Sequence, residues 1–129
     1  MTNHTETVKS LYAAFGRGDI AFILGNLAAD VIWGLEGTAE IPYAGIYRGP
    51  EQVKYFFDAL GRTSKDTMLD MTVSVSEGNK VAMFGRYAAT INGKRVNSNV
   101  AHLFVFNVDG KLAEFHDFFN TAAVAFAYR

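Results

Sequence analysis

The stretch that decides the fold runs from residue 94 to residue 120 and reads KRVNSNVAHLFVFNVDGKLAEFHDFFN. Two runs of β-branched and aromatic residues are separated here by Asp109-Gly110, a pair typical of tight hairpin turns. A two-residue loop would pair Val108 with Lys111, and the ladder would continue as Phe106–Ala113, Phe104–Phe115, His102–Asp117 and Val100–Phe119. The stretch therefore predicts an antiparallel hairpin whose register is fixed by its turn.

One face of this hairpin combines apolar rings with one polar pair. Because side chains alternate between the faces of a sheet, all these pairs share a face, and its Phe and Val content predicts that it turns inward. His102 and Asp117 then face each other with Cβ atoms about 5 Å apart. Apolar surroundings raise the proton affinity of a carboxylate and an imidazolium lowers it, so the pair suits proton transfer near neutral pH. The same pattern equally fits a buried pair that only fixes strand register.

The opposite face of the hairpin is too apolar for a fully solvated surface. It carries Leu103, Val105, Glu114, His116 and Phe118. An exposed apolar sheet face usually meets a partner, so we expect a homodimer through it. The alternative is that the C-terminal segment, with Ala125, Phe126 and Tyr128, covers this face.

Two further strands are expected upstream, over residues 68–76 and 81–91. Gly78-Asn79 and Asn92-Gly93 suit the tight turns that join them into a four-stranded meander. Strict pairing across Asn92-Gly93 places Arg86 opposite Asn99 on the outer face, whereas a bulge would move Arg86 inside.

The first half of the chain is predicted to be helical. Apolar residues recur at helical spacing from Val8 to Phe15, and Gly16 and Gly18 end that helix. Asp19 caps a second short helix, and a short strand over 31–33 and a loop over 36–49 follow. Pro50 begins a third helix, whose inner stripe is Val53, Phe56, Phe57 and Leu60. This pattern predicts one α+β domain over residues 1–129, with helices on one face of a curved sheet.

Composition excludes several classes of protein. The 129 residues carry a net charge of −1, no cysteine and eleven Phe. We therefore expect no disulfide, no thiol nucleophile and no nucleic-acid partner. No apolar run is long enough to cross a membrane, and residues 1–6 lack a signal-peptide pattern, so the expected location is cytoplasmic. His102 and His116 lie on opposite faces and phosphate or dinucleotide motifs are absent, so no metal and no cofactor is expected.

Aromatic residues from several elements are expected to wall a pocket around His102 and Asp117. Tyr12, Trp33, Tyr43 and Tyr47 are candidates for its mouth, although core packing also explains Tyr12 and Trp33. Glu36 is a candidate second carboxylate, with a solvated loop position as the alternative. The remaining expected wall residues are Phe15, Phe56, Phe104, Phe115 and Phe119.

Three segments of the chain resemble one known family. They are LYAAFGRGD (11–19), EIPYAGIYRGPEQVKYFF (40–57) and DGKLAEFHDFFNT (109–121). They resemble the SnoaL-like polyketide cyclase branch of the nuclear transport factor 2 and ketosteroid isomerase superfamily, in the family's order and over nearly the whole chain. The resemblance implies a cone-shaped α+β roll, three N-terminal helices packed on a strongly curved, mostly antiparallel sheet that encloses an apolar pocket, usually as a dimer.

The resemblance also implies an activity. Polyketide cyclases of this family close a ring by intramolecular aldol condensation without metal or organic cofactor, using an Asp on the last strands as general acid/base with a nearby His. Asp117 and His102 match these positions. We therefore expect acid/base chemistry, of aldol-cyclisation or isomerisation type, on an apolar carbonyl compound. The alternative is a non-catalytic module that binds an apolar ligand or serves dimeric protein interactions.

Some positions depart from related activities. In ketosteroid isomerases an acidic donor occupies roughly the place of His102, a tyrosine donor corresponds to Leu11, and the general base falls near residues 35–36. Epoxide hydrolysis needs an Arg with two carboxylates, and only Asp117 is well placed. Many family members have Asp where this chain has Asn120, so a role that needs this charge is not expected.

Overall fold

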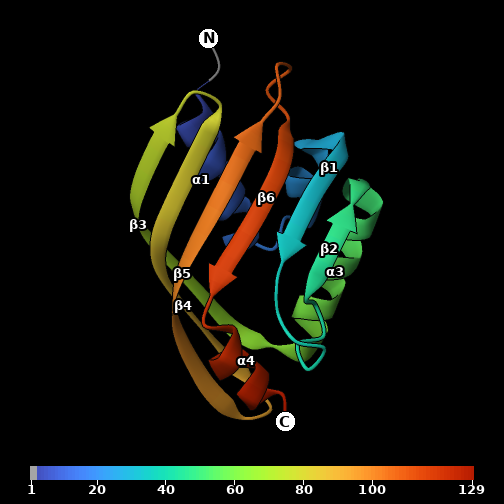
Figure 1. Ribbon diagram of the computed structural model, residues 1–129, viewed down its shortest axis with the longest axis vertical. Helices are drawn as coiled ribbons and strands as arrows, with labels where there is room; N and C mark the ends of the chain where they lie inside the picture. The colour runs from blue at the N-terminus through green and yellow to red at the C-terminus, as the bar shows by residue number, and fades with distance from the viewer. Residues whose placement is uncertain (1–2) are drawn as a thin grey trace.

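The computed structural model describes residues 3–129 (Figure 1). The expectation that residues 1–6 are not a signal peptide therefore lies partly outside the described residues. The elements of the structure are α1 (His4–Gly16), α2 (Ile20–Gly25), β1 (Leu27–Leu35), β2 (Gly45–Arg48), α3 (Gly49–Thr63), β3 (Lys65–Glu77), β4 (Lys80–Ile91), β5 (Lys94–Phe106), β6 (Leu112–Phe119) and α4 (Thr121–Ala127). The order confirms the predicted α+β class.

Helices α2 and α3 begin where Asp19 and Pro50 predict. The Asp19 carboxylate accepts a hydrogen bond from the Phe22 amide (3.0 Å), and Pro50 lies in the first turn of α3. Two elements, β2 and α4, were not expected. The Asn120 side chain caps α4 by accepting from the Ala123 amide (3.1 Å), which Asn does as well as Asp.

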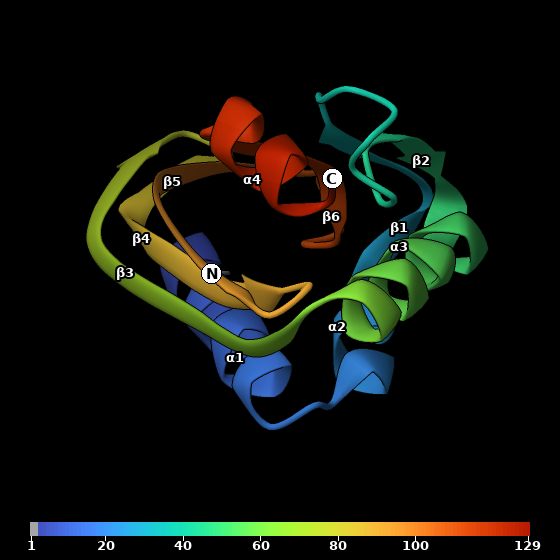
Figure 2. The same ribbon diagram turned by 90° about the horizontal axis from the view of Figure 1, so that it is seen from below.

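The six strands form one strongly curved sheet in the order β2-β1-β6-β5-β4-β3, antiparallel except for the parallel β1–β6 pair. Seen from below, the strands wrap around one side while α1, α2 and α3 close the other (Figure 2). The register of β3 against β4 shifts between Met71 and Val73, and there a Cβ on Gly85 would collide with the β3 backbone. Glycine therefore permits this close approach, and the predicted cone-shaped roll is confirmed.

The last hairpin reaches its predicted register by an unexpected route. Its turn spans Asn107–Lys111, with Gly110 at φ 77° donating to the Asn107 carbonyl (3.1 Å). The expected pairs Val108–Lys111 and Phe106–Ala113 are therefore wrong, and Phe106 pairs with Leu112 instead. A bulge next to Val105 then shifts the register by one residue. As a result Phe104–Phe115, His102–Asp117 and Val100–Phe119 pair as predicted.

The outer face of the sheet stays open in the single chain. Phe118 is 55% exposed, so the C-terminal segment does not cover it. Tyr128 instead packs edge-on against Tyr43, with ring centroids 6.1 Å apart. Arg86 lies on the outer face, where its guanidinium donates to the Asn99 side chain (2.6 Å). None of the helices between residues 3 and 129 has the length and apolar character to cross a membrane.

Candidate active-site cavity

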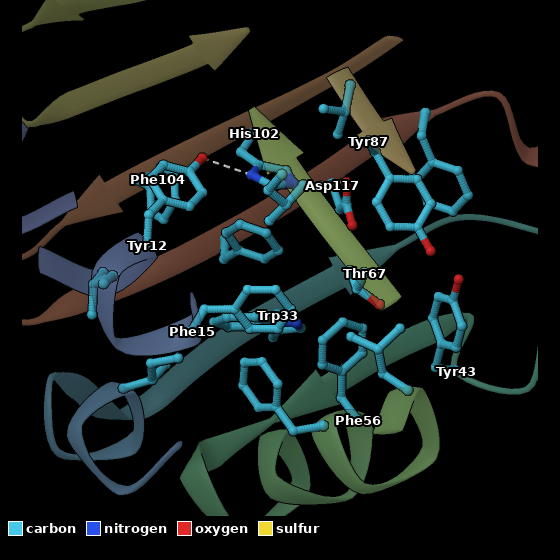
Figure 3. Close-up of a pocket in the computed structure, with 18 residues that line it drawn as sticks. Tyr12, Phe15, Trp33, Tyr43, Phe56, Thr67, Tyr87, His102, Phe104 and Asp117 are labelled. Carbon is cyan, nitrogen blue, oxygen red and sulfur yellow. Dashed lines mark hydrogen bonds and ion pairs between the residues drawn. The ribbon is translucent and has the colours of Figure 1, made fainter. Parts of the chain in front are cut away.

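The inner face of the sheet and helices α1, α2 and α3 enclose a cavity of about 90 Å³ (Figure 3), several times the room that one water molecule needs. Eighteen residues line it, and most of them are aromatic or aliphatic. They are Leu11, Tyr12, Phe15, Ile23, Trp33, Tyr43, Phe56, Phe57, Leu60, Thr67, Leu69, Tyr87, Val100, His102, Phe104, Phe115, Asp117 and Phe119.

Most of the residues expected from the sequence meet at this cavity. His102 and Asp117 lie on its wall, together with Tyr12, Phe15, Trp33, Tyr43, Phe56, Phe104, Phe115 and Phe119. Glu36 does not: it is exposed just beyond the end of β1, so its expected place in the pocket is corrected. Tyr47 is also outside the cavity wall and donates its hydroxyl hydrogen to the Tyr43 carbonyl (3.0 Å).

Three polar side chains from separate elements form a row along the wall. The Tyr12 hydroxyl from α1 lies 2.7 Å from Nδ1 of His102 on β5. Nε2 of the same imidazole lies 3.1 Å from Oδ1 of Asp117 on β6. Tyr12 follows Leu11, the position that the family resemblance matched to a tyrosine donor, and both side chains line the cavity.

The environment fixes the protons in this row. Burial, and then the negative charge of Asp117, raise the pKa of Tyr12 well above its usual value, so Tyr12 keeps its hydroxyl hydrogen. The carboxylate beside Nε2 favours the His102 tautomer with hydrogen on Nε2. In this tautomer Nδ1 of His102 accepts from the Tyr12 hydroxyl, and Nε2–H is directed to the side of Asp117.

Asp117 lies next to His102 but does not form a hydrogen bond with it. Although the two atoms are 3.1 Å apart, their alignment does not meet hydrogen-bond geometry, and Oδ1 is buried without another partner. Asp117 supplies the single carboxylate among the eighteen lining residues, and Lys and Arg are not among them. The carboxylate can therefore still accept hydrogen bonds, and it lies in apolar surroundings with no Lys or Arg side chain among the described wall residues to balance a negative charge.

A cluster of rings provides the floor beneath this row. Trp33 packs against Phe115 with ring centroids 4.0 Å apart and contacts Phe56 (5.5 Å) and Phe57 (5.4 Å). Phe115 also contacts the His102 ring (4.9 Å). Such packing binds flat apolar molecules well and holds the imidazole in place.

Two hydroxyls on the wall, those of Tyr87 and Thr67, were not expected from the sequence, and they lie near the expected Tyr43. Tyr43, Tyr87 and Thr67 lie on the other side of Asp117 from Tyr12 (Figure 3). Burial raises the pKa of both Tyr43 and Tyr87, so both stay neutral. Tyr87 pairs with Ser98, so counting back from the Asn92-Gly93 turn places it inside. Thr67 gave no such signal, because the register of β3 is irregular between Lys65 and Met68.

This architecture is that of the nuclear transport factor 2-like (NTF2-like) class of proteins. An NTF2-like protein of unknown function from Burkholderia pseudomallei K96243 superposes with a TM-score of 0.92 at 26% identity, over 99% of this chain and 98% of its own. The model of the SnoaL-like domain matches residues 8–115. The chain therefore belongs to the SnoaL-like domain family.

Two more distant structures share the fold. TerC, co-crystallised with polyporic acid, has a TM-score of 0.87 at 24% identity over 97% of each chain. A putative SnoaL-like polyketide cyclase from Jannaschia sp. CCS1 has a TM-score of 0.83 at 19% identity, over 97% of this chain and 90% of its own. No curated protein matches the chain in sequence.

Proposed function

We propose that this protein transfers protons to and from an uncharged, apolar carbonyl compound bound in the cavity, with Asp117 as general acid/base and His102 as its partner. The observation that carries the proposal is the Tyr12–His102–Asp117 row. It places a carboxylate that has a free acceptor oxygen beside an oriented N–H donor in an apolar wall. Membership of the SnoaL-like family and the polyketide cyclase named among the structural neighbours support it.

The proposed reaction follows from these positions. Asp117 removes a proton from the carbon next to the carbonyl, and the electron pair of that C–H bond forms the enolate. Nε2–H of His102 donates to the enolate oxygen, while Tyr12 holds Nδ1 and thereby the ring. The enolate carbon then bonds to a second carbonyl carbon of the same molecule, whose oxygen takes the proton back from Asp117. Return of the proton to a different carbon gives isomerisation instead.

The alternative is a non-catalytic pocket of the same fold that only holds an apolar ligand. Such a pocket is expected to have polar groups tied to one another. The unpaired Oδ1 of Asp117 favours the catalytic proposal, because a carboxylate that served structure alone would gain from a complete set of hydrogen bonds.

The test is exchange of the α-protons of 2-tetralone in D2O, followed by proton NMR. We expect wild-type protein to accelerate exchange and Asp117→Asn to lower the protein-catalysed rate by about 100-fold or more. Glu114→Gln is the matched control, because it removes a carboxylate of the same strand that lies on the outer face, and it should exchange like wild type. Unchanged exchange in Asp117→Asn would refute the assignment. Binding without exchange would favour the alternative.

We also propose that two copies associate through the outer sheet face. Val73, Phe84, Ala101 and Phe118 lie side by side across β3, β4, β5 and β6, and the Phe84 and Phe118 side chains are 44% and 55% exposed. A continuous apolar row of this kind is typical of protein interfaces. Sedimentation equilibrium should give a dimer for wild type and a monomer for Phe118→Ser, and a monomeric wild type would refute the proposal.

A further inference from the structure

The unpaired polar atoms of this protein concentrate on one wall. Within residues 3–129, four buried side-chain nitrogen or oxygen atoms have no hydrogen-bond partner. Three of them, Trp33 Nε1, Tyr87 Oη and Asp117 Oδ1, belong to residues that line the cavity. Buried polar groups are nearly always paired in folded proteins, so three unpaired atoms on one wall mark it as a place where a bound molecule can supply hydrogen-bond partners.

Trp33 is the first of these groups. Its indole nitrogen can only donate a hydrogen bond, and the residue is only 5% exposed. The ring is fixed between Phe115 and the two phenylalanines of α3, so the N–H cannot turn toward solvent. Because Trp33 lines the cavity, a molecule bound there is the candidate acceptor for this N–H.

Tyr87 is the second group. Its hydroxyl faces that of Tyr43 (Figure 3) in a contact that raises the pKa of Tyr43 and by itself lowers that of Tyr87 but falls short of full hydrogen-bond geometry. Tyr43 is the donor in such a contact, so the Tyr87 hydrogen is left without an acceptor. Because burial holds the pKa of Tyr87 above its usual value, the hydroxyl keeps its hydrogen and can donate. Figure 3 shows Asp117 between Tyr12 and Tyr87, so Tyr87 lies away from the Tyr12 end of the row.

We propose that Trp33 and Tyr87 form a second polar subsite, which binds an oxygen of the ligand other than the carbonyl that reacts at Asp117. The inference rests on the proposed function for the position of that carbonyl. Since the wall holds one carboxylate and no Lys or Arg side chain among its described residues, the ligand carries no negative charge. The expected class is an uncharged aromatic ketone with a hydroxyl or carbonyl group at its far end.

The single tryptophan of the chain makes the subsite directly observable. The ¹⁵N-labelled protein has one indole N–H signal, which belongs to Trp33. The probes are 6-hydroxy-2-tetralone and 6-methyl-2-tetralone, which differ only in the group at the far end of the molecule. We expect the hydroxy compound to move the indole proton signal downfield, as a new hydrogen bond does, and to a greater extent than the methyl compound.

Tyr87→Phe tests the second donor, because it removes only the hydroxyl. We expect the variant to bind the hydroxy compound about tenfold more weakly, about 1.4 kcal/mol, and the methyl compound as wild type does. Tyr47→Phe is the matched control, since Tyr47 is not among the lining residues and its hydroxyl is bonded to the Tyr43 backbone carbonyl. This variant should keep the wild-type preference for the hydroxy compound.

Equal indole shifts with both compounds, or equal weakening of both by Tyr87→Phe, would overturn the subsite. Failure of the hydroxy compound to bind wild-type protein would also overturn it. The proposed function is tested separately. If the hydroxy compound shifts the indole signal and binds more weakly to Tyr87→Phe, but no α-proton exchange occurs, the subsite is retained and acid/base catalysis is rejected.

Discussion

The last hairpin carries two His–carboxylate pairs of similar length on opposite faces. On the inner face His102 and Asp117 approach to 3.1 Å, and their side chains are 6% and 15% exposed. On the outer face His116 and Glu114 approach to 3.0 Å, and theirs are 33% and 46% exposed. The chemistry and the distance are nearly the same, so the surroundings make the difference.

The outer pair resembles an ordinary surface ion pair. Water screens such pairs, and their contribution to stability is about 0–1 kcal/mol. The inner pair is enclosed by rings and connected to Tyr12, so each member depends on the others to remain buried. The curved sheet, rather than the pair itself, therefore turns one of two similar contacts into a candidate site.

The largest contrast is expected between phenylalanines of the two faces. Phe115→Ala should lower the free energy of unfolding by about 3–5 kcal/mol, because it opens a void beneath His102 and Trp33. Phe118→Ala should cost less than about 1 kcal/mol in the monomer, since that ring is 55% exposed. Urea unfolding at several protein concentrations separates this effect from dimerisation. Equal losses would show that the outer face is also core.

The second-largest contrast in stability is expected between substitutions of the two histidines, His102 and His116. His102→Ala leaves the Tyr12 hydroxyl buried without its hydrogen-bond partner and removes a ring packed against Phe115, so we expect a loss of about 2–4 kcal/mol. His116→Ala should change stability by less than about 1 kcal/mol. Both values come from the same urea experiment. A His102→Ala variant as stable as wild type would mean that the inner pair contributes nothing to the fold.

The smallest expected effect is on the pH dependence of stability. Burial raises the pKa of Tyr12 and Tyr43 in the folded protein, whereas in the unfolded chain each ionises near pH 10. The unfolded state therefore releases protons first, and stability falls as the pH rises above about 10. Tyr12→Phe should flatten this decrease, measured by thermal unfolding between pH 8 and 11. Tyr55→Phe is the control, because Tyr55 is 61% exposed and should leave the slope unchanged.

Local signals in the sequence predicted much of the fold. Capping by Asp19 and Pro50 located two helices, and the turn dipeptides located the hairpins. The strand β2 was missed because four residues between turns give no periodicity. The helix α4 was missed because only the Asn120 cap and a run of small residues mark it.

Among the site residues of the sheet, only those that lie on regular strands could be predicted from the sequence. Alternation placed His102, Phe104 and Asp117 on one face, and a bulge next to Val105 compensated for the wrong turn length. The prediction that Glu36 lines the pocket was wrong because strand β1 ends one residue before it, at Leu35. Thr67 could not be found, since an irregular strand breaks the alternation on which the argument depends.

By itself, then, the sequence determined the α+β class, the inner face of the final hairpin and the pairing of His102 with Asp117, because caps, turns and alternation act over a few residues. Only the tertiary structure decided that Tyr12 reaches His102 and that Trp33 and Tyr87 stand unpaired on the same wall. These contacts join residues as much as 90 positions apart. The curvature of the sheet sets them, and no local pattern encodes the amount of that curvature.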